Sequence, residues 1–288
     1  MSKSLKAFLF KAAATTAKLA AIAYICTCGF LFLRQNQLIY TPTSDLRNTP
    51  ASAKLTHEDV WLAVPNADRD QIHGWWIPAS SEEKGVVLYF HGAGHNLSSY
   101  LGDLKSLQKM GFSVFAIDYR GYGRSKGGFP SEAQIYQDAQ ISWNYLTQQR
   151  RIASRQIYIF GVSLGGAVAI NLAQQHPDAA ALVVVSSFTR MRDQIANIGL
   201  GMFPIDLILT QKFDSVQKIK SVRMPVLLAH GAADEYIPSW MSQKLFDTAS
   251  QPKRLLLVPG IDHGRIGALI GGSNFSSAMQ QLRNEATN

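Results

Sequence analysis

Six short apolar runs, separated by longer stretches of helical pattern, constrain the fold of this chain more than any other feature. The runs are rich in β-branched residues and lie at 86–90, 113–118, 156–160, 181–186, 225–230 and 254–259. The helical stretches lie near 98–110, 131–149, 164–175 and 239–249. Strands that alternate with helices in this way form a mostly parallel sheet covered by helices on both faces. The sequence therefore predicts an α/β fold.

Two further strand candidates precede these runs. Residues 57–64 and 71–78 flank the turn-rich PNADRD, which favours an antiparallel hairpin. A chain of 288 residues can form all of this as one domain. Its composition, 47% hydrophobic and 17% charged, excludes a disordered chain. No second apolar stretch of membrane length is present, which excludes a polytopic membrane protein.

An uncharged apolar stretch, residues 19–33, lies near the N-terminus. Extended back to residue 12 it includes one charge, Lys18, and as a helix it measures about 33 Å, enough to cross a hydrocarbon core of about 30 Å. A cleaved signal peptide and a peripheral helix are the alternatives, but no small-x-small cleavage site follows the run. The sequence therefore predicts an uncleaved membrane anchor over residues 1–34.

Charge predicts the orientation of this anchor. Four lysines precede the apolar stretch and Arg34 follows it. The positive-inside rule then predicts a single-pass protein with its N-terminus in the cytoplasm and its body on the opposite side of the membrane. Residues 35–55, rich in Pro, Thr, Ser and Asn, are expected to form a linker, and residues 56–288 the folded body.

The basic excess belongs mostly to the anchor. The chain carries a formal charge of +8, of which residues 1–34 supply five basic residues and no acid, leaving +3 for the rest. No nucleic-acid partner is therefore expected. Both cysteines, Cys26 and Cys28, also lie in this segment, so the body has no disulfide framework and no cysteine nucleophile.

The sequence Gly161-Val162-Ser163-Leu164-Gly165 is the first motif that carries chemistry. A bare G-x-S-x-G is weak, but this one follows an apolar strand and precedes a helical stretch. A tight turn between strand and helix exposes the serine Oγ, and the glycines keep Cβ atoms out of that turn. Ser163 is therefore the candidate nucleophile; a plain strand–turn–helix connection is the alternative.

A nucleophilic serine needs a base, and the base needs an orienting acid. His263 follows the last apolar strand, at the loop position where α/β enzymes place catalytic groups. Asp234 directly follows the strand candidate 225–230, which gives the chain order Ser163, Asp234, His263 of an α/β-hydrolase sheet. The remaining acid candidates are Asp262, Glu235, Asp206 and Asp214.

The fourth element is the glycine-containing turn after the strand candidate 86–90. His91-Gly92-Ala93-Gly94 can turn a backbone N–H toward the serine. With the N–H of Leu164, the N–H of Ala93 would form an oxyanion hole; Gly94 is the alternative donor. His91 itself is expected to hold this loop rather than act as a second base.

With these elements in order, the chain resembles the α/β-hydrolase superfamily of serine hydrolases over about 56–270. The motifs HGAGHN, DYRGYGRSKG, GVSLGG, HGAADEYIP and DHG stand where that family carries HG-x-G, a D-x-R-G-x-G-x-S segment, the nucleophile elbow, the acid turn and the terminal histidine. The resemblance implies structural or pocket-shaping roles for Asp118, Arg120 and Ser125. The tail after His263 is short and glycine-rich, which leaves a terminal helix open.

The anchor followed by QNQLIYTPTS is similar to the small membrane-anchored branch of that superfamily, in which L-I-Y-x-P follows a single span. Some members of that branch are implicated in thioester or depalmitoylase-type hydrolysis. The resemblance thus implies an α/β-hydrolase fold with a short lid and an N-terminal transmembrane helix.

Residues 187–224 are expected to form the lid. Their stretch IANIGLGMFPIDLIL is unusually apolar for an exposed connection. It fits either a small lid packed on the core or an acyl-chain pocket or membrane-facing surface. Together with the anchor it favours acylated or lipid-like substrates.

The expected reaction is hydrolysis of carboxylic esters or thioesters through an acyl-enzyme intermediate. A serine at the elbow argues against dehalogenase and epoxide hydrolase members, whose nucleophile is Asp. No cofactor is expected, and no metal site, because the sequence has neither HExxH nor clustered ligands. A peptidase or amidase on the same fold and a non-catalytic membrane-tethered binding module are the alternatives. The acyl chain, leaving group and oligomeric state stay open.

Overall fold

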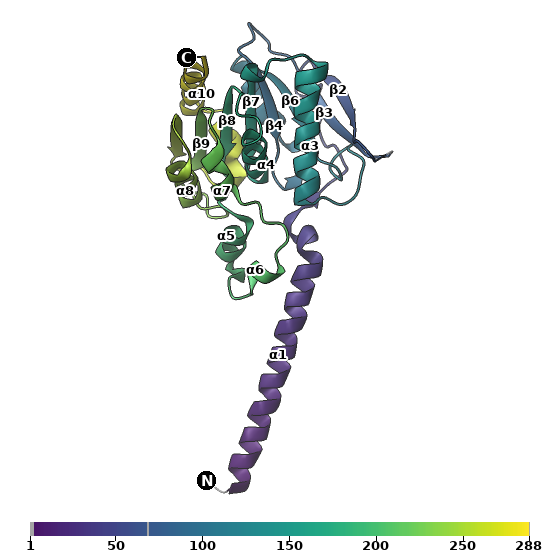
Figure 1. The fold of residues 1–288 in the computed structure, drawn as a ribbon, viewed down its shortest axis with the longest axis vertical. Helices are drawn as coiled ribbons and strands as arrows, with labels where there is room; N and C mark the ends of the chain where they lie inside the picture. The colour runs from purple at the N-terminus through teal and green to yellow at the C-terminus, as the bar shows by residue number, and fades with distance from the viewer. Residues whose placement is uncertain (1–2, 68, 288) are drawn as a thin grey trace.

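A computed structural model describes residues 3–67 and 69–287 of the chain. A long helix leaves a globular body at one end, and the body is built on a twisted sheet (Figure 1). The strands are β1 (Thr41–Pro42), β2 (Glu58–Ala63), β3 (Gln71–Ile77), β4 (Val86–Phe90), β5 (Gly94–His95), β6 (Ser113–Ile117), β7 (Ile157–Val162), β8 (Ala181–Val185), β9 (Val226–Gly231) and β10 (Lys253–Val258).

The main sheet has eight strands in the order β10-β9-β8-β7-β4-β6-β3-β2. β2 and β3 form the predicted antiparallel hairpin, β3 is also antiparallel to β6, and the remaining neighbours are parallel. The predicted α/β fold with a mostly parallel sheet is therefore confirmed.

Helices cover both faces of this sheet (Figure 1). The helices are α1 (Lys3–Ile39), α2 (Leu101–Lys109), α3 (Glu132–Asn144), α4 (Leu164–Ala173), α5 (Met191–Ile195), α6 (Ile205–Ile208), α7 (Ser215–Lys218), α8 (Trp240–Thr248), α9 (Ile266–Ile270) and α10 (Ser273–Thr287). Short 3-10 helices and π-helices are η1 (Leu97–Ser99), η2 (Tyr145–Gln149), η3 (Ser154–Gln156), η4 (Ala196–Leu200), η5 (Ile219–Ser221) and η6 (His263–Arg265).

Two apolar cores result, one on each face. Side chains along a strand point alternately to opposite faces, and β4 follows this rule: Val86, Leu88 and Phe90 pack beneath α3 and α4, whereas Val87 and Tyr89 pack on the side of α2 and α10. All five are buried. Helix α10 supplies the terminal helix that the short tail left open.

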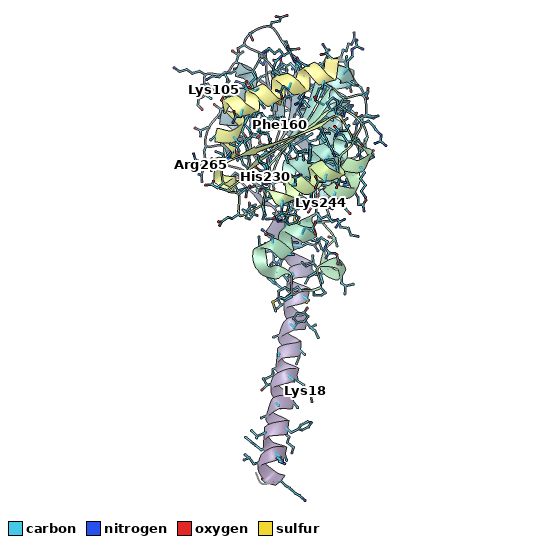
Figure 2. The ribbon with its side chains drawn as sticks, turned by 90° about the vertical axis from the view of Figure 1, so that its left-hand side faces the viewer. Lys18, Lys105, Phe160, His230, Lys244 and Arg265 are labelled. Carbon is cyan, nitrogen blue, oxygen red and sulfur yellow. The ribbon has the colours of Figure 1, made fainter. Side chains whose placement is uncertain are left out.

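The helix α1 extends beyond the predicted end of the anchor at residue 34. It runs to Ile39, and one residue later the chain enters β1, which pairs with β5. Helix α1 has 37 residues, is about 55 Å long, and is apolar enough to cross a membrane. The division at residues 34 and 55 stays a prediction, but the first part of the expected linker is helical and bound to the body. Lys18 lies on α1 well away from the body (Figure 2).

Candidate active site

Ser163 lies in a strained turn between β7 and α4. β7 ends at Val162 and α4 begins at Leu164, so the serine is the single residue between them. Its φ of 55° and ψ of −120° are unusual for a residue with a side chain. The turn is crowded: a Cβ on Gly161 would lie 2.0 Å from the carbonyl oxygen of Gly165. The glycine therefore permits the turn that exposes the Ser163 side chain.

The structure brings the three residues of the predicted triad together. Ser163 Oγ lies 3.2 Å from His263 Nε2, and His263 Nδ1 lies 2.7 Å from Asp234 Oδ2. Each follows the carboxyl end of a strand, β7, β9 or β10, so the parallel sheet delivers them to one edge. The histidine thus bridges the hydroxyl and the carboxylate.

Asp234 is held as a carboxylate. Its Oδ1 accepts a hydrogen bond from the Ile237 N–H at 2.8 Å, and its side chain is fully buried. Burial by itself raises the pKa of Asp234, but hydrogen bonds from His230, His263 and Ile237 outweigh this effect. The pKa therefore lies well below its usual range. A charged acceptor of this kind fixes His263 with a proton on Nδ1 and leaves Nε2 facing the serine.

The other acid candidates lie elsewhere. Within the described residues, neither Glu235 nor Asp262 contacts the His263 ring through a hydrogen bond or ion pair. Asp206 pairs with Arg192, and Asp214 Oδ1 lies 3.1 Å from Arg190 Nε.

Ala93 and Leu164, the predicted oxyanion donors, line the same cavity as Ser163. Leu164 is the first residue of α4, so its N–H has no partner inside the helix. Among residues 3–67 and 69–287, neither this N–H nor that of Ala93 donates to a protein acceptor. Gly94, the alternative donor, lies in β5 opposite Thr41 of β1. Ala93 and Leu164 therefore each bring an N–H without a protein acceptor to the lining of the cavity that contains Ser163.

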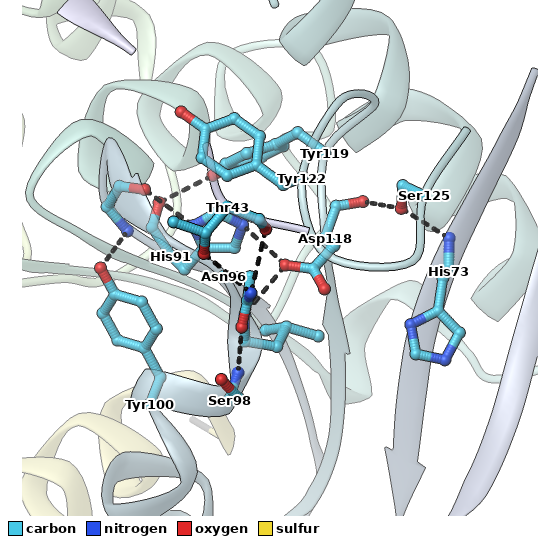
Figure 3. A network of polar contacts seen from close by, with 12 residues as sticks. Thr43, His73, His91, Asn96, Ser98, Tyr100, Asp118, Tyr119, Tyr122 and Ser125 are labelled. Carbon is cyan, nitrogen blue, oxygen red and sulfur yellow. Dashed lines mark hydrogen bonds and ion pairs between the residues drawn. The ribbon is translucent and has the colours of Figure 1, made fainter. Parts of the chain in front are cut away.

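Residues 91–95 are here called the oxyanion loop. Several side chains hold its backbone carbonyls by hydrogen bonds (Figure 3). The Tyr119 hydroxyl donates to the His91 carbonyl at 3.0 Å, and the Tyr122 hydroxyl donates to that of Ala93 at 2.7 Å. His91 is fully buried and its Nδ1 donates to the Gly92 carbonyl at 2.7 Å. These contacts fix the direction of the loop backbone.

Asp118 and Ser125 make no contact with Ser163, but their hydrogen bonds hold the segment that follows β6. Asp118 Oδ1 accepts from the Leu97 N–H at 2.9 Å, and the Ser125 hydroxyl donates to the Asp118 carbonyl at 2.7 Å (Figure 3). Arg120 Nε donates to Asp138 at 2.7 Å, on the far side of the same turn. These contacts anchor the segment that carries Tyr119 and Tyr122.

Residues 40–45, here called the strap, form a part of this site that the motifs did not single out. The Thr41 N–H donates to the Ala93 carbonyl at 3.0 Å. Asn96 Nδ2 donates to the carbonyls of Thr43 at 3.0 Å and of Asp45 at 2.8 Å. The only signal in the sequence was the L-I-Y-x-P stretch, whose contacts depend on the folded loop.

An apolar cavity of about 130 Å³ opens at Ser163. The predicted lid forms much of it through α5, η4 and α6, and Tyr236 lies at its edge with its ring centroid 5.0 Å from that of His263. Helix α1 contributes Leu31, Gln35 and Leu38. The lining residues include no Asp, Glu, Lys or Arg.

No group of three or more potential metal ligands occurs in the described part of the chain. What the described residues place together is a serine hydroxyl, a histidine and a buried carboxylate at the edge of an apolar cavity.

Comparisons with known proteins agree with the fold. A family model described as serine aminopeptidase, S33, matches residues 81–213. The α/β hydrolase domain-containing protein WAV2 of Arabidopsis thaliana is 30% identical, over 75% of this chain and 76% of that protein. The lysophosphatidylserine lipase ABHD12 of Danio rerio is 32% identical, over 68% of this chain but only 56% of its own length.

Among solved structures, an esterase of Pyrococcus furiosus, Pf2001, superposes with a TM-score of 0.69. The match covers 85% of this chain and 96% of the esterase, at 20% sequence identity. At that identity the likeness concerns the fold.

Proposed function

The chain belongs to the α/β-hydrolase superfamily, and we propose that it is a serine hydrolase that cleaves carboxylic esters or thioesters of acylated, lipid-like substrates. The observation that supports this most directly is the continuous path from the Asp234 carboxylate through His263 to Ser163 Oγ, with distances of 2.7 and 3.2 Å. The hydroxyl at its end faces an apolar cavity.

The proposed reaction has two stages. Ser163 Oγ attacks the acyl carbonyl while His263 Nε2 takes its proton, and the buried Asp234 stabilises the imidazolium. The N–H groups of Ala93 and Leu164 donate to the oxyanion that forms. His263 then returns the proton to the departing alcohol or thiol, and water releases the acyl group by the same route.

The cavity favours an acyl substrate over a peptide. An aminopeptidase must hold the charged amino end of its substrate, and carboxylates are the groups that do so. Among the described residues that line the cavity, the polar ones are Gln35, Ser163, Gln194 and Tyr236, and none is acidic. An apolar lining instead favours a hydrocarbon chain.

We further propose that α1 anchors the protein in a membrane, with the N-terminus in the cytoplasm and the body on the opposite side. Its length and apolar composition support a span. Its orientation rests on the four lysines before the apolar stretch and the single Arg34 after it.

Labelling with a fluorophosphonate probe tests the proposed chemistry. The full-length protein, purified in detergent, should label at Ser163, and Ser163→Ala should abolish labelling and lower ester hydrolysis by at least about a thousandfold. Ser187→Ala is the control, because Ser187 is a buried serine whose Oγ has no hydrogen-bond partner within the described residues. A folded wild-type protein that does not label would favour a non-catalytic membrane-tethered module.

A further inference from the structure

Helix α1 contacts the lid at two positions along its length. Near the body, Gln35 Oε1 accepts from the Thr210 N–H at 2.7 Å, and Gln35 Nε2 donates to the Ile208 carbonyl at 3.3 Å. Further along α1, the Tyr24 hydroxyl donates to the Met202 carbonyl at 3.1 Å. The Tyr24 ring also stacks on Phe203 with 5.5 Å between centroids.

These contacts follow one stripe of α1. Tyr24, Leu31, Gln35 and Leu38 are separated by seven, four and three residues, a spacing that places them on one helix face. Leu33, between them in sequence, is on another face and is 75% exposed. The lid and the cavity therefore use one side of α1, and Leu33 is not among the residues that line the cavity.

The lower contact lies within the apolar stretch of α1. Tyr24 is about 22 Å along the helix axis from Ile39, where α1 ends. Residues 196–208, here called the lid tip, contact α1 at this level through Met202, and Figure 1 shows α6 beside α1. Residues 196–205 carry no charge, and Ile198, Met202 and Leu207 are exposed. Residues 196–205 thus continue the apolar surface of the helix, and Asp206, the charged residue of the lid tip, is paired with Arg192.

The cavity connects this surface to the serine. Its lining includes Ser163, Leu31 and the lid tip residue Phe203, whose ring stacks on Tyr24 of α1. A chain lying in it contacts α1 on one side and the lid on the other. Its volume of about 130 Å³ is close to that of an apolar cavity that accepts one benzene ring, which suits one hydrocarbon chain rather than two.

We propose that α1 is a wall of the acyl-chain pocket as well as an anchor, and that the acyl chain of the substrate reaches Ser163 from the bilayer between α1 and the lid tip. This inference rests on the proposed hydrolase function and adds the route and the specificity-determining residue. Leu31 then discriminates acyl chains by length, because a short acyl group bound at Ser163 does not reach it.

The test compares two esters with the full-length protein in phosphatidylcholine vesicles. The substrates are p-nitrophenyl acetate and p-nitrophenyl laurate, and the variant is Leu31→Trp, whose larger side chain fills the cavity. Laurate hydrolysis should fall roughly tenfold or more, whereas acetate hydrolysis and fluorophosphonate labelling should stay within about twofold of wild type. Leu33→Trp, the matched control, should leave both esters unaffected.

Other outcomes overturn the inference. Laurate hydrolysis by Leu31→Trp at the wild-type rate would remove α1 from the pocket. Equal loss of both esters with labelling intact would show that the helix does not discriminate chain length. A wild-type protein that hydrolyses acetate but not laurate would exclude the acyl-chain assignment while keeping the hydrolase. Failure of wild type to label or to cleave either ester would instead reject the proposed function itself.

Discussion

Asp103 is a buried carboxylate that takes no part in the proposed reaction. It lies in the first turn of α2, is 5% exposed, and accepts a hydrogen bond from the Tyr89 hydroxyl at 2.7 Å. Burial raises its pKa to about 6, although the hydrogen bond from Tyr89 opposes the rise. In the unfolded chain the pKa of an Asp is about 3.9. The folded protein therefore binds this proton more tightly.

The Asp103→Asn variant should be more stable than wild type at neutral pH. Between about pH 4 and pH 6 the folded state holds a proton that the unfolded state has lost, so wild-type stability falls as pH rises across that window. The full effect corresponds to about 3 kcal/mol at most. Asparagine keeps an acceptor for Tyr89 without the charge.

Thermal unfolding of both proteins in detergent, at pH 4 and at pH 7, measures this effect. The two should have similar midpoints at pH 4, and Asp103→Asn should have the higher midpoint at pH 7. A variant that is less stable than wild type at pH 7 would contradict the assignment.

The residues proposed as the triad could be identified from the sequence because each directly follows a strand. In a parallel sheet the carboxyl ends of strands share one edge, so Ser163, Asp234 and His263 had to lie near one another. The contacts of His230 and Tyr236 could not be predicted in this way. They arise from packing between loops, where sequence position does not fix the direction of a side chain.

At the scale of secondary-structure elements, the strap is short but holds the oxyanion loop in position. β1 has two residues, yet it pairs with β5 and, through the Thr41 N–H, holds the same Ala93 carbonyl that Tyr122 contacts. Asn96, 1% exposed, ties the rest of the strap to the end of this loop. The direction of the Ala93 N–H therefore depends on a segment that follows the anchor.

Replacing Asn96 by alanine should loosen the strap and misalign the oxyanion loop. The kcat should fall roughly tenfold or more with KM little changed, because the oxyanion exists only after attack on the carbonyl. Thr41→Val is the control, since it removes only the 3.5 Å contact of the Thr41 hydroxyl with the Ala93 carbonyl, to which the backbone N–H of residue 41 still donates at 3.0 Å.

Steady-state hydrolysis of p-nitrophenyl acetate by the full-length proteins gives the two constants. An unchanged kcat in Asn96→Ala, or a higher KM with kcat retained, would exclude the positioning role. Thermal midpoints measured alongside separate it from a general loss of folding.

The elements themselves were predicted unevenly, for a physical reason. Buried strands such as β4 and β8 are continuous apolar runs bounded by turns, so the sequence marks their ends within a residue or two. Helix α1 continues past residue 34, where the sequence predicted the anchor to give way to a linker. The polar residues Gln35 and Asn36 resemble a linker in sequence, but they are the polar contacts of a helix with the body.

At the scale of the whole molecule, the lid tip and α1 together define a level for the membrane. Met202 is 74% exposed and contacts α1 at Tyr24, inside the apolar stretch. If α1 spans the bilayer as proposed, Met202 lies within the hydrocarbon region rather than in water. Lys244, on α8, is exposed on the body instead (Figure 2).

A fluorescent label attached through Met202→Cys, with Cys26 and Cys28 replaced by serine, should be quenched by lipids that carry a nitroxide on the acyl chain. The same label attached through Lys244→Cys should be quenched little, because that position faces water. Equal quenching at the two positions in reconstituted vesicles would show that the lid tip does not enter the bilayer.

The fold class could be predicted from the alternation of strands and helices, because that pattern is local and repeated. The placement of the lid against α1 could not. The stretch IANIGLGMFPIDLIL suggested burial or a membrane surface, and the structure gives it both environments: Ile205 and Leu209 are buried, whereas Ile198 and Leu207 are exposed. The spacing of apolar residues along the sequence cannot distinguish a side chain buried in the core from one that faces a lipid bilayer, because both environments are apolar.

Only Tyr40 separates the end of α1 from β1, and it is buried. No flexible linker therefore separates α1 from the first strand of the body. If α1 spans the bilayer as proposed, Ser163 is held at a nearly fixed height above the membrane, whereas a flexible tether would let the body explore a volume. The search for substrate would then be two-dimensional, set by lateral diffusion in one leaflet, and molecules dissolved in water would meet the serine only where they first reach the membrane surface.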